Sequence, residues 1–132
     1  EKGFASSRSI FATGVAGVGE LSAALGRTVG SGVKGQALAL RFEARDRAQL
    51  FVDGLHIVPH ADGTVAVGST SETSWDAEGP DGQLEGLLDR AVRAVPILHG
   101  AAVVARWAGV RPRAVSRAPV LGAWPGRAGH WV

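Results

Sequence analysis

The chain has 132 residues, of which 45% are hydrophobic and 20% charged, and its formal net charge is +2. The absence of cysteine excludes disulfides, thiolate metal sites and a cysteine nucleophile. The basic residues are scattered rather than gathered in a stripe with interleaved aromatics, and no apolar run is long enough for a membrane span, so neither nucleic acid nor a bilayer is expected as a partner.

The N-terminal third of the chain is predicted to form two strands separated by a short helix. Residues 9–12 are a short apolar strand. Residues 20–25 are a short helix that Gly26 ends. Alternating apolar residues then predict a longer strand over residues 33–42.

A hairpin is the strongest turn signal in the chain, because Asp62-Gly63 stands between two apolar stretches. Gly54 is a second hinge. The extended stretches that these turns separate are residues 50–53, 55–59 and 65–67.

One amphipathic helix follows a polar loop over residues 70–82. Apolar side chains recur at helical spacing from Leu84 to Val95, and Pro96 closes the helix. The remaining strands are predicted at residues 101–110, 119–123 and 130–132. Because hairpins predominate, we expect an α+β fold, a largely antiparallel (mixed) sheet with one main amphipathic helix packed on one face.

A glycine-rich segment, residues 14–19, is interpreted as a turn between a strand and a helix. Such turns hold dinucleotides when they carry the pattern G-x-G-x-x-G. Counted from Gly17, the last glycine of that pattern is replaced by Ser22. The segment therefore predicts a tight turn rather than an independent dinucleotide site.

Four motifs stand in the order of one known family. Residues 10–14 read Ile-Phe-Ala-Thr-Gly, and residues 33–36 read Val-Lys-Gly-Gln. Residues 56–70 begin with His-Ile-Val-Pro and end with Val-Gly-Ser-Thr. Residues 107–112 read Trp-Ala-Gly-Val-Arg-Pro, followed by Pro-Val-Leu-Gly at 119–122. In their order and spacing these motifs resemble the D-amino-acid oxidase and glycine oxidase family of flavoproteins.

The resemblance implies an FAD-dependent enzyme that oxidises amino acids or secondary amines by hydride transfer to flavin. Residues 1–14 would be the tail of its FAD-binding domain, and residues 15–132 its substrate-binding domain. The family's N-terminal Rossmann segment and its C-terminal flavin loop are absent from the chain. Alone, the chain is therefore expected neither to hold FAD nor to turn over.

The resemblance also implies the residues of the site. Arg111 stands where the family's arginine binds the substrate carboxylate, and a guanidinium matches a carboxylate through two parallel hydrogen bonds. His56, at a position where tyrosine is more usual, and Ser71 would line the same pocket. The residues expected to approach the flavin are Thr13, Gly14 and Gly109. No residue need act as a covalent catalyst, because the cofactor supplies the redox chemistry.

A metal site at His56, His60 and Asp62 is not expected. Four strand residues span roughly 13 Å, which is too far for two imidazoles to share one ion.

The expected partner is a small amino-acid or amine substrate. A homo-oligomer is compatible with this interpretation, and a cytoplasmic location is the default expectation. The alternative, from another class, is a non-catalytic carboxylate-binding or assembly subunit of a flavoprotein complex. A G-x-G-x-x-G turn upstream and a Gly-His-x-x-x-Gly loop downstream would favour the enzyme.

Overall fold

The computed structural model describes residues 8–132 and contains two compact units. One of them, called the terminal unit below, contains residues 8–33 and Arg111–Val132. Residues Lys34–Val110 form the other, called the central unit. Neither described helix is long and apolar enough to cross a membrane.

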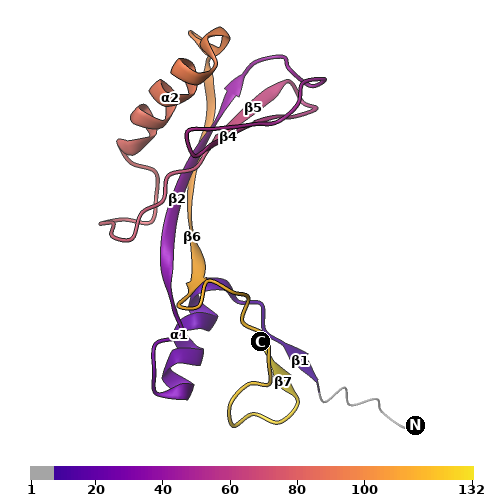
Figure 1. Ribbon diagram of the computed structural model, residues 1–132, viewed down its shortest axis with the longest axis vertical. Helices are drawn as coiled ribbons and strands as arrows, with labels where there is room; N and C mark the ends of the chain where they lie inside the picture. Colours follow the sequence, from indigo (N-terminus) through magenta and orange to yellow (C-terminus); the bar gives the residue numbers. More distant parts are fainter. Residues whose placement is uncertain (1–7) are drawn as a thin grey trace, which may run out of the picture. The chain divides into compact units, whose positions relative to one another are not determined.

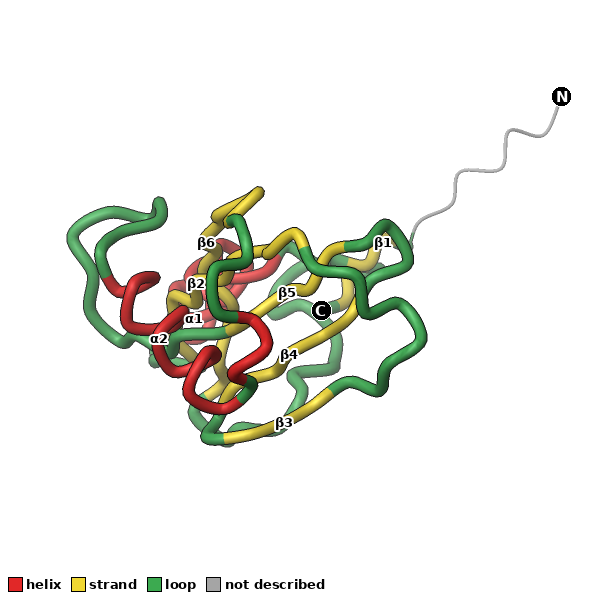
Figure 2. The backbone as a smooth tube through the Cα atoms, turned by 90° about the horizontal axis from the view of Figure 1, so that it is seen from above, coloured by secondary structure: helices red, strands yellow, loops and turns green. Residues whose placement is uncertain are grey.

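The central unit is built on a five-stranded sheet with the strand order β3-β4-β5-β2-β6 (Figure 1; β3 is labelled in Figure 2). The pairs β3–β4, β4–β5 and β5–β2 are antiparallel, which confirms the expected largely antiparallel α+β fold. The strands are β2 (Gly30–Arg41), β3 (Leu50–Val52), β4 (Leu55–Pro59), β5 (Thr64–Gly68) and β6 (Val103–Ala114).

Two tight turns connect β3 to β4 and β4 to β5. The predicted hairpin at Asp62-Gly63 is confirmed: Gly63 has a φ of +77°, and the Thr64 N–H donates to Asp62 Oδ1 at 3.0 Å. Asp53 and Gly54 also have positive φ values, 49° and 73°. The expected hinge at Gly54 is therefore a full reversal of the chain, because two successive positive φ values suit a two-residue hairpin turn.

The hydrophobic core lies between the sheet and α2 (Gln83–Ala94), which Figure 2 shows beside β4 and β5. A short 3-10 helix, η1 (Pro96–Leu98), follows it. The core side chains from α2 are Leu84, Leu87 and Ala91, and those from the sheet are Leu38, Leu40, Leu55, Ile57, Val65 and Val67. Because side chains alternate along a strand, the opposite face of the sheet carries the residues between these.

In the terminal unit, β1 (Ser9–Ile10) pairs in parallel with β7 (His130–Trp131) (Figure 1). The helix α1 spans Gly14–Leu25, and Gly26 ends it as expected, with a φ of +62°. The turn expected over residues 14–19 is wrong, because these residues are helical. Gly17 is buried there, and a Cβ at this position would lie 2.1 Å from Thr13 Oγ1, so this glycine allows close packing.

Two strand predictions near the C-terminus need correction. β6 does not stop at Val110 but continues through Pro112, whose missing N–H is tolerated because β6 is an edge strand. Residues 119–123 are not a strand, and only Ala123 forms a bridge, to Trp131. The chain turns back within a few residues, so the ladder stays short.

Candidate functional site

His56 lies on the face of the sheet that α2 does not cover. Its neighbours Leu55 and Ile57 are buried in the core, so the imidazole stands on the opposite, exposed side. The Phe51 ring centroid is 4.6 Å from that of the imidazole, and Gln49 Nε2 is 3.1 Å from His56 Nδ1. These two neighbours hold the orientation of the ring.

Small residues surround His56 on this face. His56 pairs with Gly68, which in turn pairs with Ala37, and a Cβ on Gly68 would lie 2.8 Å from that of Ala37. Ala39 and Ala66 continue the same face. We call the surface formed by Ala37, Ala39, His56, Ala66 and Gly68 the open face. Apart from His56, this face carries only methyl groups and the bare backbone of Gly68.

Ser71 is exposed in the segment that follows β5. On either side of it, the Thr70 N–H donates to the Gln36 carbonyl at 3.1 Å, and Glu72 forms an antiparallel bridge with Lys34. The Thr70 hydroxyl accepts from the Gln36 backbone N–H, and the Glu72 carboxylate faces the side chains of Gln36 and Lys34. Ser71 and Thr70 border a pocket of about 380 Å³ together with Gln83, Gly86, Leu87 and Arg90 of α2.

Arg111 and Gly109 both lie on β6 and are exposed. A Cβ on Gly109 would have no atom within 4 Å, so packing does not require glycine there and the surface above it is open. Arg111 belongs to the terminal unit and His56 to the central unit. That their side chains reach one face stays a prediction.

Thr13 and Gly14 border a cavity of about 770 Å³ within the terminal unit. Its other walls are mainly apolar and include Phe11, Val18 and Leu121. Thr13 is the N-cap of α1 but makes no side-chain capping hydrogen bond, and Gly14 has a φ of +64° with open space around it. Cavities of this size and apolar lining are typical of cofactor sites.

A literal G-x-G-x-x-G pattern at residues 30–35 does not form a phosphate site. It lies inside β2, whereas the phosphate-binding turn joins a strand to the N-terminus of a helix. Gly30 has a packing role instead, since a Cβ there would lie 2.7 Å from the Arg113 carbonyl oxygen.

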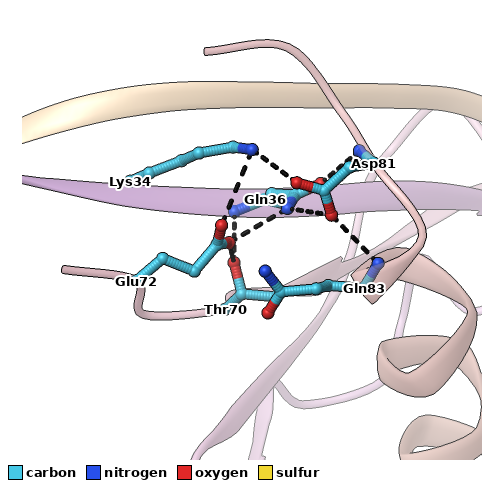
Figure 3. Close-up of polar contacts among 6 residues, drawn as sticks. All are labelled: Lys34, Gln36, Thr70, Glu72, Asp81 and Gln83. Atoms are coloured by element: carbon cyan, nitrogen blue, oxygen red, sulfur yellow. Dashed lines mark hydrogen bonds and ion pairs between the residues drawn. The ribbon is translucent and has the colours of Figure 1, made fainter. Parts of the chain in front are cut away.

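A largely buried polar cluster, in which the Asp81 side chain is 42% exposed, lies at the end of the core in the central unit (Figure 3). Sequence reasoning missed it. Lys34 and Gln36 are both fully buried. Lys34 Nζ lies 2.6 Å from Asp81 Oδ2 and 3.6 Å from Glu72 Oε2. Gln36 Nε2 donates to Glu72 Oε1 at 3.0 Å and to Asp81 Oδ1 at 2.8 Å. We call Lys34, Gln36, Thr70, Glu72 and Asp81 the Lys34 cluster.

Hydrogen bonds and charge keep the cluster ionised. The hydrogen bonds that Lys34 and Gln36 donate to Asp81 lower the pKa of Asp81 to about 2. The hydrogen bond between Lys34 and Asp81 also raises the pKa of Lys34. Burial pushes the pKa of Glu72 upward, but hydrogen bonds from Thr70 and Gln36 and the charge of Lys34 outweigh it and leave that pKa lowered. Among the described buried side-chain atoms, Glu72 Oε2 alone lacks a hydrogen-bond partner.

Replacing Asp81 by asparagine is expected to reduce the acid sensitivity of the protein. The pKa of Asp81 is about 2 in the folded state, below its ordinary value of 3.8. Its stabilising contribution is therefore present above pH 4 and lost as the pH falls toward 2. Urea unfolding at several pH values should show Asp81→Asn less stable than the parent at neutral pH, with the difference shrinking in acid.

The matched control is Asp89→Asn, because Asp89 is an exposed residue of α2 outside the cluster. This variant should lose stability in acid as the parent does. A constant difference between Asp81→Asn and the parent from pH 7 to pH 2 would contradict the role given to Asp81.

Comparison with known proteins gives consistent matches. The family model described as "DAO: FAD dependent oxidoreductase" matches residues 2–132. Glycine oxidase of Pseudomonas putida is 38% identical over 103 residues, which are 76% of this chain and 28% of that protein. The crystal structure of glycine oxidase from Geobacillus kaustophilus superposes with a TM-score of 0.81 at 29% identity, covering 95% of this chain and 35% of that one.

An iminodiacetate oxidase from Chelativorans sp. superposes with a TM-score of 0.67 at 26% identity, covering 78% of this chain and 30% of that one. The chain thus spans about a third or less of the length of these relatives.

Proposed function

Because the chain belongs to the DAO family of FAD dependent oxidoreductases, we propose that it is the substrate-binding part of an enzyme that oxidises a small amino acid or secondary amine. The observation that carries this proposal is the open face, where alanine and glycine residues flank an imidazole whose orientation Gln49 and Phe51 hold. Glycine and iminodiacetate, which name two of the relatives, both carry a carboxylate one carbon from the amine nitrogen. A substrate of this class suits the chain.

Each proposed site residue has one task. The Arg111 guanidinium binds the substrate carboxylate through two parallel hydrogen bonds, which also sets the direction in which the C–H bond points. His56 and Ser71 form polar walls beside the amine or its substituent. The small residues of the open face let the substrate lie flat against the sheet. FAD, when bound, supplies the hydride acceptor.

Part of an FAD site fits the residues present. Thr13 and Gly14 border an apolar cavity large enough for a flat ring system, and Gly109 leaves open surface on β6. Residues 30–35 lie within β2 and do not form the phosphate-binding turn that leads into a helix. We therefore infer that Thr13, Gly14 and Gly109 contact FAD but do not bind it without further residues. In this proposal residues 1–14 end the FAD-binding domain and residues 15–132 form the substrate domain; residues 1–7 lie outside the described part.

The test uses the full-length, FAD-loaded protein without oxygen. Glycine, iminodiacetate and methylamine are added separately, and reduction of the flavin is followed by its loss of visible absorbance. We expect the two carboxylate-bearing amines to reduce the flavin rapidly and methylamine to reduce it only slowly. Binding of glycine with no flavin reduction by any amine or amino acid would contradict the proposal and favour a non-catalytic carboxylate-binding subunit.

A further inference from the structure

We propose that the Lys34 cluster is a positioning device for Ser71, and that through this residue it sets how tightly the enzyme binds its substrate. The inference rests on the proposed function, in which Ser71 lines the substrate pocket. Its starting point is that both sequence neighbours of Ser71, Thr70 and Glu72, belong to the cluster (Figure 3).

The backbone on both sides of Ser71 is hydrogen-bonded to β2. The Lys34 N–H donates to the Glu72 carbonyl, and the Glu72 N–H donates to the Lys34 carbonyl, both at 2.9 Å. On the other side, the Thr70 N–H donates to the Gln36 carbonyl at 3.1 Å, and the Gln36 N–H donates to Thr70 Oγ1 at 2.8 Å. These four bonds leave the Cα of Ser71 little freedom.

Side-chain ion pairs also connect the loop over residues 73–80 to β2. Lys34 Nζ pairs with Glu72 at the start of this loop and with Asp81 at its end. Asp81 then leads into α2, since its Oδ1 accepts from the Gln83 N–H at 3.0 Å. One buried ammonium group therefore ties both ends of the loop to β2.

The fold itself does not need charges at these positions. A buried ion pair can often be replaced by apolar side chains of similar volume without loss of stability, because desolvation offsets its attraction. Hydrogen bonds and ion pairs are directional, however, whereas apolar contacts are not. The fully buried Lys34 thus supplies a fixed geometry next to Ser71 that Met and Leu would not supply.

The experiment compares two double variants of the full-length, FAD-loaded enzyme. Lys34→Met/Glu72→Leu removes the buried pair, whereas Glu43→Leu/Arg45→Met removes an exposed ion pair of the same unit, with its 2.6 Å contact, as the control. We expect the first variant to raise KM for glycine about fivefold or more, as couplings within one network do. Its kcat should stay within about twofold, and the control should change neither constant.

The Ser71→Ala variant tests whether the cluster affects substrate binding through Ser71. If the cluster acts through Ser71, Ser71→Ala alone raises KM, and adding it to Lys34→Met/Glu72→Leu raises KM no further. If the double variant does not fold, Glu72→Gln, which keeps the shape of the side chain, replaces it in the same comparison. A general loss of structure would instead lower the melting temperature and kcat in every background.

The two hypotheses fail in different ways. If the parent enzyme oxidises no amino acid or amine, the proposed function is wrong. If the parent oxidises glycine but the cluster variant keeps its KM, or the effects of the cluster and Ser71→Ala are additive, only the positioning role is wrong.

Discussion

Replacing Leu87 by alanine is expected to lower the free energy of unfolding by about 2–5 kcal/mol. Leu87 of α2 is 1% exposed and belongs to the core between that helix and the sheet. Truncating it removes buried apolar contacts and leaves a cavity that the surrounding strands can fill only in part. Urea unfolding of the full-length protein, followed by hydrogen exchange of the backbone amides of α2 in the central unit, measures the loss.

Ile97→Ala is the matched control, because Ile97 in η1 is 71% exposed. Its change should stay within about 0.5 kcal/mol. Similar losses for the two variants would show that α2 does not pack on the sheet through Leu87. Because the chain contains two units, both measurements need a probe that reports on the central unit.

The helix α2 and the hairpin at Asp62-Gly63 could be predicted because their signals are local. Apolar residues at helical spacing predicted a helix over residues 84–95, and the structure has Gln83–Ala94. Asp-Gly favours a turn through the backbone preferences of two adjacent residues. Such elements need no knowledge of what packs against them.

Elements that depend on distant contacts were missed or misplaced. Pro112 predicts the end of a strand when read locally, yet β6 passes through it because the strand lies at the edge of the sheet. Gly17 resembles a turn residue, but it lies in α1, where its missing Cβ makes room for the side chain of the N-cap residue Thr13. Only the strand order and the packing distinguish these cases.

The residues of the candidate site also differ in whether a local sequence signal could predict them. His56 was predicted from the resemblance alone. In the structure it lies on the exposed face of β4 between buried Leu55 and Ile57, and its place in a substrate pocket stays a prediction. Lys34 and Gln36 stand in phase with the core residues Leu38 and Leu40, and this was the one local sign of a buried polar cluster. Asp81, 45 positions after Gln36, joins them through the fold, and no local pattern predicts that contact.

Replacing Arg111 by lysine in the full-length enzyme is expected to lower kcat/KM for an amino acid by about 1–3 kcal/mol in transition-state free energy, or roughly 5- to 150-fold. Lysine keeps the positive charge but lacks the planar pair of donors that matches a carboxylate. Arg106→Lys is the control, because Arg106 is another exposed arginine of β6 and has no proposed role in the site. It should change kcat/KM by less than about twofold.

Arg111→Ala removes the charge as well, so its loss for the amino acid should exceed that of Arg111→Lys. The amine that lacks the carboxylate offers nothing for the guanidinium to bind, and its slow oxidation should be almost unaffected by either replacement. Comparing kcat/KM for an amino acid and its decarboxylated amine in each variant therefore isolates the carboxylate contact. Equal losses for the two substrates would mean that Arg111 supports the strand rather than the substrate, and the pocket would then need another cation to hold the acid.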